Sequence, residues 1–303
     1  MFGRKRRQEI GYFQDLVNAH DEAARALMPA GRWHEAYEHS SMALAAVYRL
    51  QDIDPGNPDN DPVLAAKLYN QATIARHVGD MKVALASATE AVELYEQLAR
   101  RDPATYRTLL ADAQARLGLL TSVSGDEKAG RSLRGRAAQT YREAASSDPD
   151  KEHDLARVLA LQANVAWSTN REEAVEAAWE ALRIFRRVRA PLAASDQEAF
   201  GMAALIVAKA SLDGGRDRDV QDAVRDAVEQ LRHGFERAPD DNAGWYAQSL
   251  ALLARHHVSQ GAVDKARQAT ADAARVLQQA PGARPGRADA EELIATLKER
   301  LAD

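Results

Sequence analysis

The sequence contains few side chains that could carry enzyme chemistry, and their spacing matches no catalytic motif. It has no cysteine, which excludes a thiolate nucleophile, a disulfide framework and a zinc–thiolate site. Eight histidines are scattered along the chain. His34 and His39 are five residues apart and His256 and His257 are adjacent, so neither pair has the i, i+4 spacing of a helical zinc site. There is no His-Glu-x-x-His motif, glycine-rich phosphate loop or Gly-x-Ser-x-Gly elbow, so we expect no enzyme activity, cofactor or metal.

Two polar segments could bind ions, but local structure explains each of them better. Residues 54–62 are rich in Asp, Asn and Pro without the spacing of a calcium loop, and we expect Asp61 to cap a helix that begins at Pro62. Residues 131–136, with Arg142 beyond them, are basic but lack interleaved aromatic residues. We interpret them as a solvated helix face, with a site for an anion or an acidic partner as the alternative.

A skeleton of small residues organises the rest of the chain. Ala72, Gly79, Ala84 and Ala91 stand seven, five and seven residues apart. This spacing is typical of two antiparallel helices that pack closely at the alanines and join at a turn where glycine adopts positive φ. Five further copies begin at Ala24, Gly118, Ala163, Ala208 and Ala254. One of these copies has Asn170 in the turn, and we expect this residue to take the left-handed conformation that glycine takes elsewhere.

This skeleton resembles the tetratricopeptide-repeat (TPR) family. The matching residues are Leu68-Tyr69-Asn70-x-Ala72, the turn Gly79-Asp80, and the turn-to-helix segments 31–36 and 261–266. The turns lie 45 to 48 residues apart, against about 34 in the usual repeat, so the resemblance is to a long-helix variant. It implies an all-α fold, a right-handed α-α superhelix (TPR-like solenoid) of about six helix pairs plus a C-terminal capping helix. A less regular α-α superhelix is the alternative.

Helix-breaking residues between the copies predict the domain organisation. Residues 1–8 are expected to form a basic N-terminal tail, residues 9–281 the solenoid, and residues 287–303 the capping helix. Prolines just outside helices, as in Asp102-Pro103, mark the boundaries. The predicted repeats are 9–53, 62–101, 104–147, 152–190, 193–238 and 242–280.

The composition favours a helical scaffold over a nucleic-acid or membrane protein. Hydrophobic residues make up 46% of the chain and aromatic residues only 6%. The net charge of −5, from 40 basic and 45 acidic residues, argues against a nucleic-acid partner. The basic start is not followed by the apolar run of a signal peptide, and no apolar stretch is long enough to span a bilayer. We expect a cytoplasmic location, and the frequent alanine and arginine indicate a bacterial source.

The resemblance implies that the first helix of each pair lines a concave groove. An asparagine there can bond a peptide backbone as donor and acceptor, and arginine and lysine can bind carboxylates. The predicted ligand is therefore a protein or peptide with acidic character. Four further positions on the groove side of these helices, called the companion positions, are Asp21, Ala115, Leu205 and Ala251. The predicted partner-binding residues are Arg25, Tyr69, Asn70, Thr73, Arg76, Arg116, Leu119, Asn164, Trp167, Lys209 and Arg255.

Two functions follow from this groove. The first is a non-enzymatic scaffold or adaptor that binds a protein or peptide. The alternative is a signal receptor or regulatory protein whose solenoid binds a small peptide or other ligand and controls a partner. A receptor should melt at a higher temperature when its small ligand is added, whereas a scaffold needs no such ligand. The family's carboxylate clamp for chaperone tails is not expected, because only Asn70 matches it.

Overall fold

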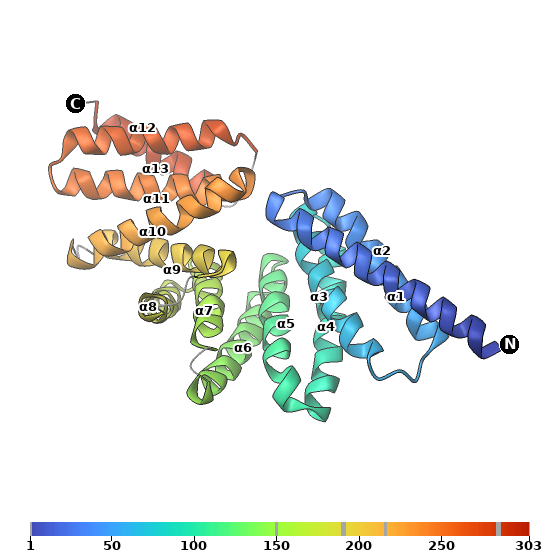
Figure 1. Ribbon diagram of the computed structural model, residues 1–303. Coiled ribbons are helices and arrows are strands. Elements are labelled where there is room, and N and C mark those ends of the chain that lie inside the picture. The colour runs from blue at the N-terminus through green and yellow to red at the C-terminus, as the bar shows by residue number, and fades with distance from the viewer. Residues whose placement is uncertain (1, 149–150, 189–191, 215–216, 283–285, 303) are drawn as a thin grey trace. The chain divides into compact units, whose positions relative to one another are not determined.

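The computed structural model describes residues 2–148, 151–188, 192–214, 217–282 and 286–302 (Figure 1). Within these ranges the regular structure consists of thirteen α-helices and one short 3-10 helix, η1 (Met28–Ala30), without a strand. Consecutive helices pack in pairs, and a single helix follows the sixth pair. The predicted all-α fold of six helix pairs with a C-terminal helix is confirmed.

The chain forms two compact units, each with three helix pairs, and the second unit also contains the C-terminal helix. The first unit, residues 1–148, contains α1 (Phe2–Leu27), α2 (Trp33–Ile53), α3 (Asn60–Val78), α4 (Met81–Arg101), α5 (Pro103–Val123) and α6 (Glu127–Ser147). The second unit, residues 149–303, contains α7 (Glu152–Ala166), α8 (Arg171–Arg187), α9 (Ala194–Asp213), α10 (Asp217–Arg237), α11 (Pro239–Ser259), α12 (Val263–Gln279) and α13 (Arg287–Arg300). One uninterrupted solenoid over residues 9–281 stays a prediction.

The small-residue skeleton lies in the interfaces between helices. Ala72, Ala84 and Ala91, the alanines of the α3–α4 pair, are fully or almost fully buried. Helices α5 and α6 approach each other closely, and a Cβ on Gly118 would lie 2.8 Å from the carbonyl oxygen of Gly130. A Cβ on Gly130 would lie 2.5 Å from the carbonyl oxygen of Gly118. Glycine replaces alanine in this copy because the two backbones touch.

The turns follow the predicted pattern with one exception. Gly31, Gly79, Gly125 and Gly261 all have positive φ, between 67° and 105°. The prediction for Asn170 is wrong: its φ is −148°, and its side chain instead caps α8 by accepting a hydrogen bond from the backbone N–H of Glu173 at 3.4 Å. This turn is one residue shorter, so the asparagine stands at the N-cap, a position that its side chain strongly favours. The predicted turn glycine at position 215 lies outside the described residues.

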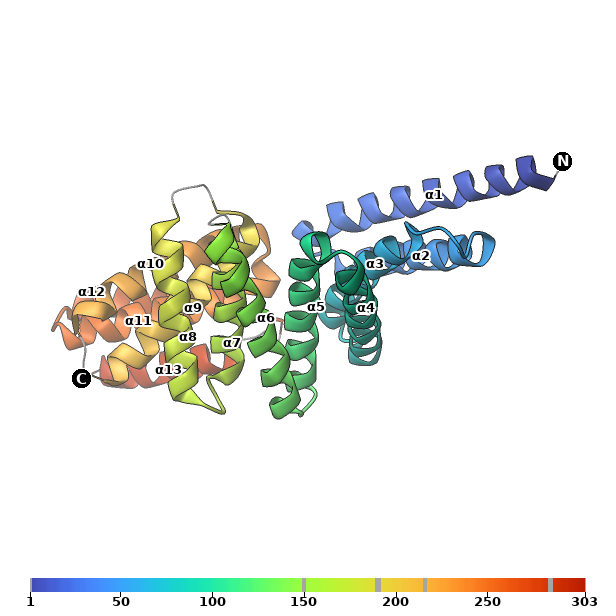
Figure 2. The ribbon, with the colours of Figure 1, turned by 90° about the horizontal axis from the view of Figure 1, so that it is seen from below.

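Two predicted helix starts also differ from the structure. Helix α1 already begins at Phe2, so the expected tail forms its first turns, and Arg6 bonds to Asp54 (2.8 Å) beyond the end of α2. Helices α1 and α2 run side by side in both views (Figures 1 and 2). Helix α3 begins at Asn60, with Asp59 at its N-cap, and the Asn60 amide donates to the carbonyl oxygen of Asp54 at 2.7 Å. Asp61 is therefore not the cap.

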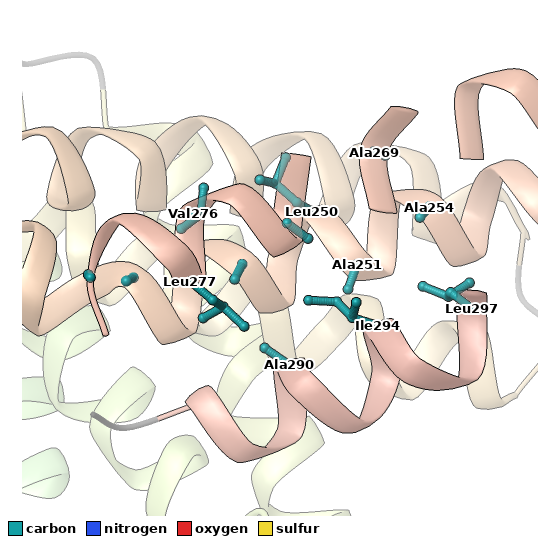
Figure 3. Packing of buried hydrophobic residues seen from close by; sticks show 13 residues of the cluster. Leu250, Ala251, Ala254, Ala269, Val276, Leu277, Ala290, Ile294 and Leu297 are labelled. Atoms are coloured by element: carbon teal, nitrogen blue, oxygen red, sulfur yellow. The ribbon is translucent and has the colours of Figure 1, made fainter. Parts of the chain in front are cut away.

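Helix α13 covers the apolar surface of the last pair, as expected of a capping helix. Ala290, Ile294 and Leu297 of α13 are buried against α11 and α12 (Figure 3). At its start Gly286 has a φ of 77°, and a Cβ there would lie 2.7 Å from the ring of Trp245 on α11. This close contact brings the first turn of α13, including Asp289, to the first helix of the pair.

Candidate partner-binding site

The first helices of the three pairs in the second unit line a cavity of about 130 Å³. A cavity of about 150 Å³ in another protein holds a benzene molecule, so this one has room for a single side chain or a small ligand. Its lining combines apolar side chains with a few polar groups. The lining residues are Asn164, Trp167 and Ser168 at the end of α7, Met202, Leu205, Ile206 and Lys209 on α9, Trp245 and Gln248 on α11, and Asp289 on α13.

The rim contains a carboxylate held by two donors. Lys209 Nζ donates to Asp289 Oδ2 at 3.1 Å, and Gln248 Nε2 donates to the same oxygen at 3.0 Å. Partial burial alone would raise the pKa of Asp289, but the hydrogen bond and charge of Lys209, helped by Gln248, outweigh burial and lower that pKa from its ordinary value. Asp289 therefore stays ionised at neutral pH.

The carboxamide of Gln248 is buried, with only 1% of the residue exposed. Its orientation follows from its partner, because the opposite orientation would place Oε1 against the carboxylate oxygen of Asp289. As a result Oε1 is a buried acceptor with no hydrogen-bond partner among the described residues. An acceptor left in this state destabilises the fold by about 1–3 kcal/mol.

The Trp167 ring is held at the rim by two cations. The guanidinium carbon of Arg171 lies 4.4 Å from the ring centroid, and Lys209 Nζ lies 4.9 Å from it. Arg171 also forms an ion pair with Asp213, and Arg255 binds the same carboxylate at 2.9 Å. Arg255, a predicted groove residue, therefore stands next to this network and does not line the cavity.

The predicted groove residues of the first unit form separate small clusters. The Arg116 guanidinium lies 5.5 Å from the Tyr69 ring centroid, and Thr73 Oγ1 donates to the Tyr69 carbonyl oxygen at 3.2 Å. Arg25 binds Asp21 at 2.8 Å. Asp21 itself is buried and also binds Lys67 at 2.6 Å.

The third cluster of the first unit joins α3 to the start of α2. Arg76 lies 3.0 Å from the ring nitrogen of His77, and the His77 ring stacks on Trp33 with 3.7 Å between centroids. Asn70 and Leu119 are half-buried. All four companion positions, Asp21, Ala115, Leu205 and Ala251, are buried, which is contrary to the groove exposure expected of them.

Six cavity residues escaped the sequence analysis: Ser168, Met202, Ile206, Trp245, Gln248 and Asp289. The family resemblance predicts groove positions near the middle of the first helices. Helices α9 and α11 also line the cavity with residues that lie one to two turns before those positions. A helical spacing search along α11 could have found Trp245 and Gln248, which are three residues apart. Nothing in the sequence indicated Asp289, because its place depends on how α13 docks.

The basic segment 131–136 is not one solvated face. Arg134 is completely buried and donates to the Gly118 carbonyl oxygen (3.0 Å) and to Ser122 Oγ (2.6 Å), while its charge pairs with Glu127 at 3.0 Å. The glycine at position 118 leaves space for its side chain, since a Cβ there would lie 2.8 Å from Arg134 Cγ. The interpretation of this segment as solvated is therefore wrong for Arg134.

Two histidines meet although their positions in the sequence did not suggest it. His20 Nδ1 and His39 Nδ1 lie 2.9 Å apart between α1 and α2. In the described part of the chain, no three His, Asp or Glu side chains are grouped so that they could hold a metal ion. A search of the described helices also finds none with the length and apolar character needed to cross a bilayer.

Comparisons with known proteins define the class of fold. No protein-family profile matches the chain, and no curated protein matches its sequence. The crystal structure of BtubC (BKLC) from P. vanneervenii is similar with a TM-score of 0.58 and 17% identity, over 84% of this chain and 94% of that one. A putative kinesin light chain from Podosopora anserina with nearly identical TPR-like repeats gives a TM-score of 0.46 at 16% identity, over 72% of this chain and 95% of that one. With its six helix pairs, the chain has the fold of a tetratricopeptide-like helical-repeat protein.

Proposed function

We propose that this chain is a non-enzymatic scaffold or adaptor that binds a protein or peptide through the first-helix face of its second unit. The observation that supports this proposal is the cavity. Predicted groove residues from two helices, Asn164, Trp167 and Lys209, line it together with Trp245 and Gln248. An apolar hollow rimmed by a few polar groups is the usual form of a site that anchors a partner's side chain.

The second unit is favoured over the first because its groove residues converge. In the first unit, the arginines at 25 and 116 contact other residues of that unit, Asp21 and Tyr69. In the second unit, side chains from the first helices of three pairs and from α13 surround one space large enough for a ligand group. Tyrosine, tryptophan and arginine are the residues that most often dominate binding energy at interfaces, and two tryptophans line this space.

The proposal is tested with a phage-displayed random-peptide library selected against the full chain. Selected peptides are then measured by calorimetry against Trp167→Ala/Met202→Ala, which removes two walls of the cavity. We expect a loss of affinity of about tenfold or more, because truncating a buried anchor site typically costs that much. Arg183→Ala, at an exposed position on α8, is the matched control and should bind as the wild type does.

A second variant locates the surface if the proposal is wrong. Tyr69→Ala/Asn70→Ala/Arg76→Ala changes the predicted groove of the first unit. Binding that survives the cavity variant but is lost in this triple variant would move the site to the first unit. Circular dichroism and thermal melting must show that each variant is folded.

The size of the cavity also supports the alternative function, a receptor for a small ligand that controls a partner. Its volume of about 130 Å³ suits one small molecule as well as one side chain. Cell extract filtered to remove proteins should raise the melting temperature of a receptor. It should leave a pure scaffold unchanged. The cytoplasmic location stays a prediction that cell fractionation would test.

A further inference from the structure

We infer that Lys209 and Gln248 form a carboxylate-binding site that the chain's own Asp289 fills, and that a partner displaces Asp289 with a carboxylate next to an apolar side chain. This inference rests on the proposed function and names the ligand chemistry of the same cavity. It assigns Asp289 the role of an internal substitute for the partner's acidic group.

The two donors and the carboxylate differ in how exposed they are. Gln248 is almost completely buried and the Lys209 side chain is 19% exposed, whereas the Asp289 side chain is 56% exposed. The donors are therefore part of the wall of the cavity, and the carboxylate approaches them from the solvent side. A ligand carboxylate can reach the same donors from the same side.

Displacement of Asp289 does not require α13 to leave. The helix is held by Ala290, Ile294 and Leu297, which are at most 5% exposed in the core with α11 and α12 (Figure 3). Rotation of the exposed Asp289 side chain is sufficient to free Lys209 Nζ and Gln248 Nε2. The exchange replaces one charge-assisted pair at Lys209 by another, and the displaced Asp289 carboxylate turns into solvent.

The carboxamide of Gln248 favours a peptide over a simple carboxylate. Its Nε2 donates to the carboxylate, while its buried Oε1 lacks a donor. A peptide brings both groups, because a backbone N–H accompanies each carboxylate-bearing residue. The Gln248 side chain can turn to meet this N–H once Asp289 has moved away. The partner's amide would then satisfy an acceptor that the free chain leaves unpaired.

The rest of the cavity specifies the neighbouring group. Met202, Leu205 and Ile206 form an apolar surface beside the carboxylate site, and Trp245 adds an aromatic wall. The volume of about 130 Å³ accommodates one apolar side chain. The ligand is therefore a peptide in which an acidic group is adjacent to an apolar side chain.

The experiment uses three small probes and the full-length chain. N-acetyl-leucine carries a terminal carboxylate, N-acetyl-aspartyl-leucinamide carries a side-chain carboxylate, and N-acetyl-leucinamide carries none. Binding is followed by NMR through the indole N–H signals of Trp167 and Trp245, with those of Trp33 and Trp179 as internal references, since the chain has four tryptophans. The two carboxylate probes distinguish a chain terminus from an acidic side chain as the source of the group.

Removing the internal competitor should strengthen binding. We expect Asp289→Ala to bind at least one carboxylate probe about tenfold more tightly than the wild type, because a tethered competitor acts at a high effective concentration. Lys209→Met in the Asp289→Ala background should remove this gain. Glu291→Ala, which removes an exposed carboxylate of the same helix, is the control and should bind as the wild type does.

Equal affinity of wild type and Asp289→Ala for both carboxylate probes would overturn the inference, as would equal binding of N-acetyl-leucinamide in the Asp289→Ala variant. Asp289→Asn is measured in parallel, because it keeps a polar residue in the first turn if the alanine variant loosens α13. The proposed function has a separate readout. Library peptides that bind the wild type but not the Trp167→Ala/Met202→Ala variant support the scaffold function. They do so even if the Asp289 experiments show that Asp289 does not compete with a ligand carboxylate.

Discussion

Gly118 and Gly130 determine how closely α5 and α6 pack. Each lies against the carbonyl oxygen of the other, at a distance that leaves no space for a methyl group. The same contact makes room for the aliphatic stem of Arg134, whose charge is then satisfied inside the pair by Glu127 and Ser122. One pair of glycines therefore explains both the close packing and an arginine with no exposed surface.

Gly118→Ala should lower the free energy of unfolding by about 1–3 kcal/mol, the typical effect of overpacking. The new Cβ would lie 2.8 Å from backbone oxygen of Gly130, which cannot move without shifting α6. Urea denaturation followed by circular dichroism measures the change. Gly135→Ala on α6 is the control, because it meets nothing within 4 Å and should instead stabilise the helix by about 0.5–1 kcal/mol. Equal stability of Gly118→Ala and wild type would contradict the contact.

Tyr95 should make the first unit sensitive to alkali. Burial raises the pKa of its phenol to about 12 from the ordinary 10.0, so the neutral form is favoured in the folded state. The unfolded chain loses this proton first, and stability that is complete below pH 10 should fall by about 2 kcal/mol as the pH rises towards 12. Tyr95→Phe should show a smaller alkaline loss in urea titrations. The exposed Tyr12→Phe should behave as the wild type; identical pH profiles for all three would refute this assignment.

At the scale of elements, several helix boundaries have a local cause. Asp80, Asp102 and Asp126 cap the starts of α4, α5 and α6 by accepting hydrogen bonds from backbone N–H groups. Left-handed glycines end the preceding helix in several turns. One of these caps also forms a contact between repeats. The Tyr37 hydroxyl donates to Asp80 at 3.1 Å and so joins the first helix pair to the second.

Asp80→Ala should destabilise the first unit by about 1 kcal/mol, because the N–H of Val83 loses its acceptor. The Tyr37 hydroxyl loses its partner in the same variant. Asp80→Asn keeps an oxygen at the N-cap and should recover most of the loss, since asparagine caps about as well as aspartate. The comparison of the two variants by chemical denaturation decides between a cap and a purely electrostatic role. An alanine variant as stable as the asparagine variant would exclude the cap.

At the scale of the whole molecule, each unit has its own apolar interior. In the first unit, Val47, Leu68 and Leu120 are buried among helices of that unit. In the second unit, Leu250, Leu277 and Ile294 form a core that ends under α13 (Figure 3). In repeat proteins stability is approximately a sum over repeats and their nearest neighbours.

Fragments 1–148 and 149–303 should therefore each fold when expressed alone. We expect helical circular dichroism and a cooperative urea transition for each, because each unit contains three helix pairs that pack on one another. The fragment 149–303 should also keep the tryptophan NMR signals of the cavity. A fragment that remains unfolded, while the full chain folds, would show that the division into two units does not hold for stability.

The sequence by itself determined the helix pairs and most of their turns. Small residues seven and five apart carry this information locally, because each pair packs through its own skeleton and each turn needs its own glycine. Asn170 was misassigned because its side chain can serve a left-handed turn or an N-cap, and turn length decided between them. The prediction for Asp61 failed as well, because α3 begins one residue earlier, at Asn60, with Asp59 as its N-cap.

Only the tertiary structure determines which residues form the cavity. Asn164, Trp167 and Lys209 were predicted as groove residues from positions in single repeats, but their grouping around one space depends on the packing of α7, α9 and α11. Lys209 and Asp289 are 80 residues apart, and they meet because Gly286 fits against Trp245 and sets the docking of α13. Short-range spacing can encode a helix pair, whereas contacts between distant side chains arise from the packing of whole helices.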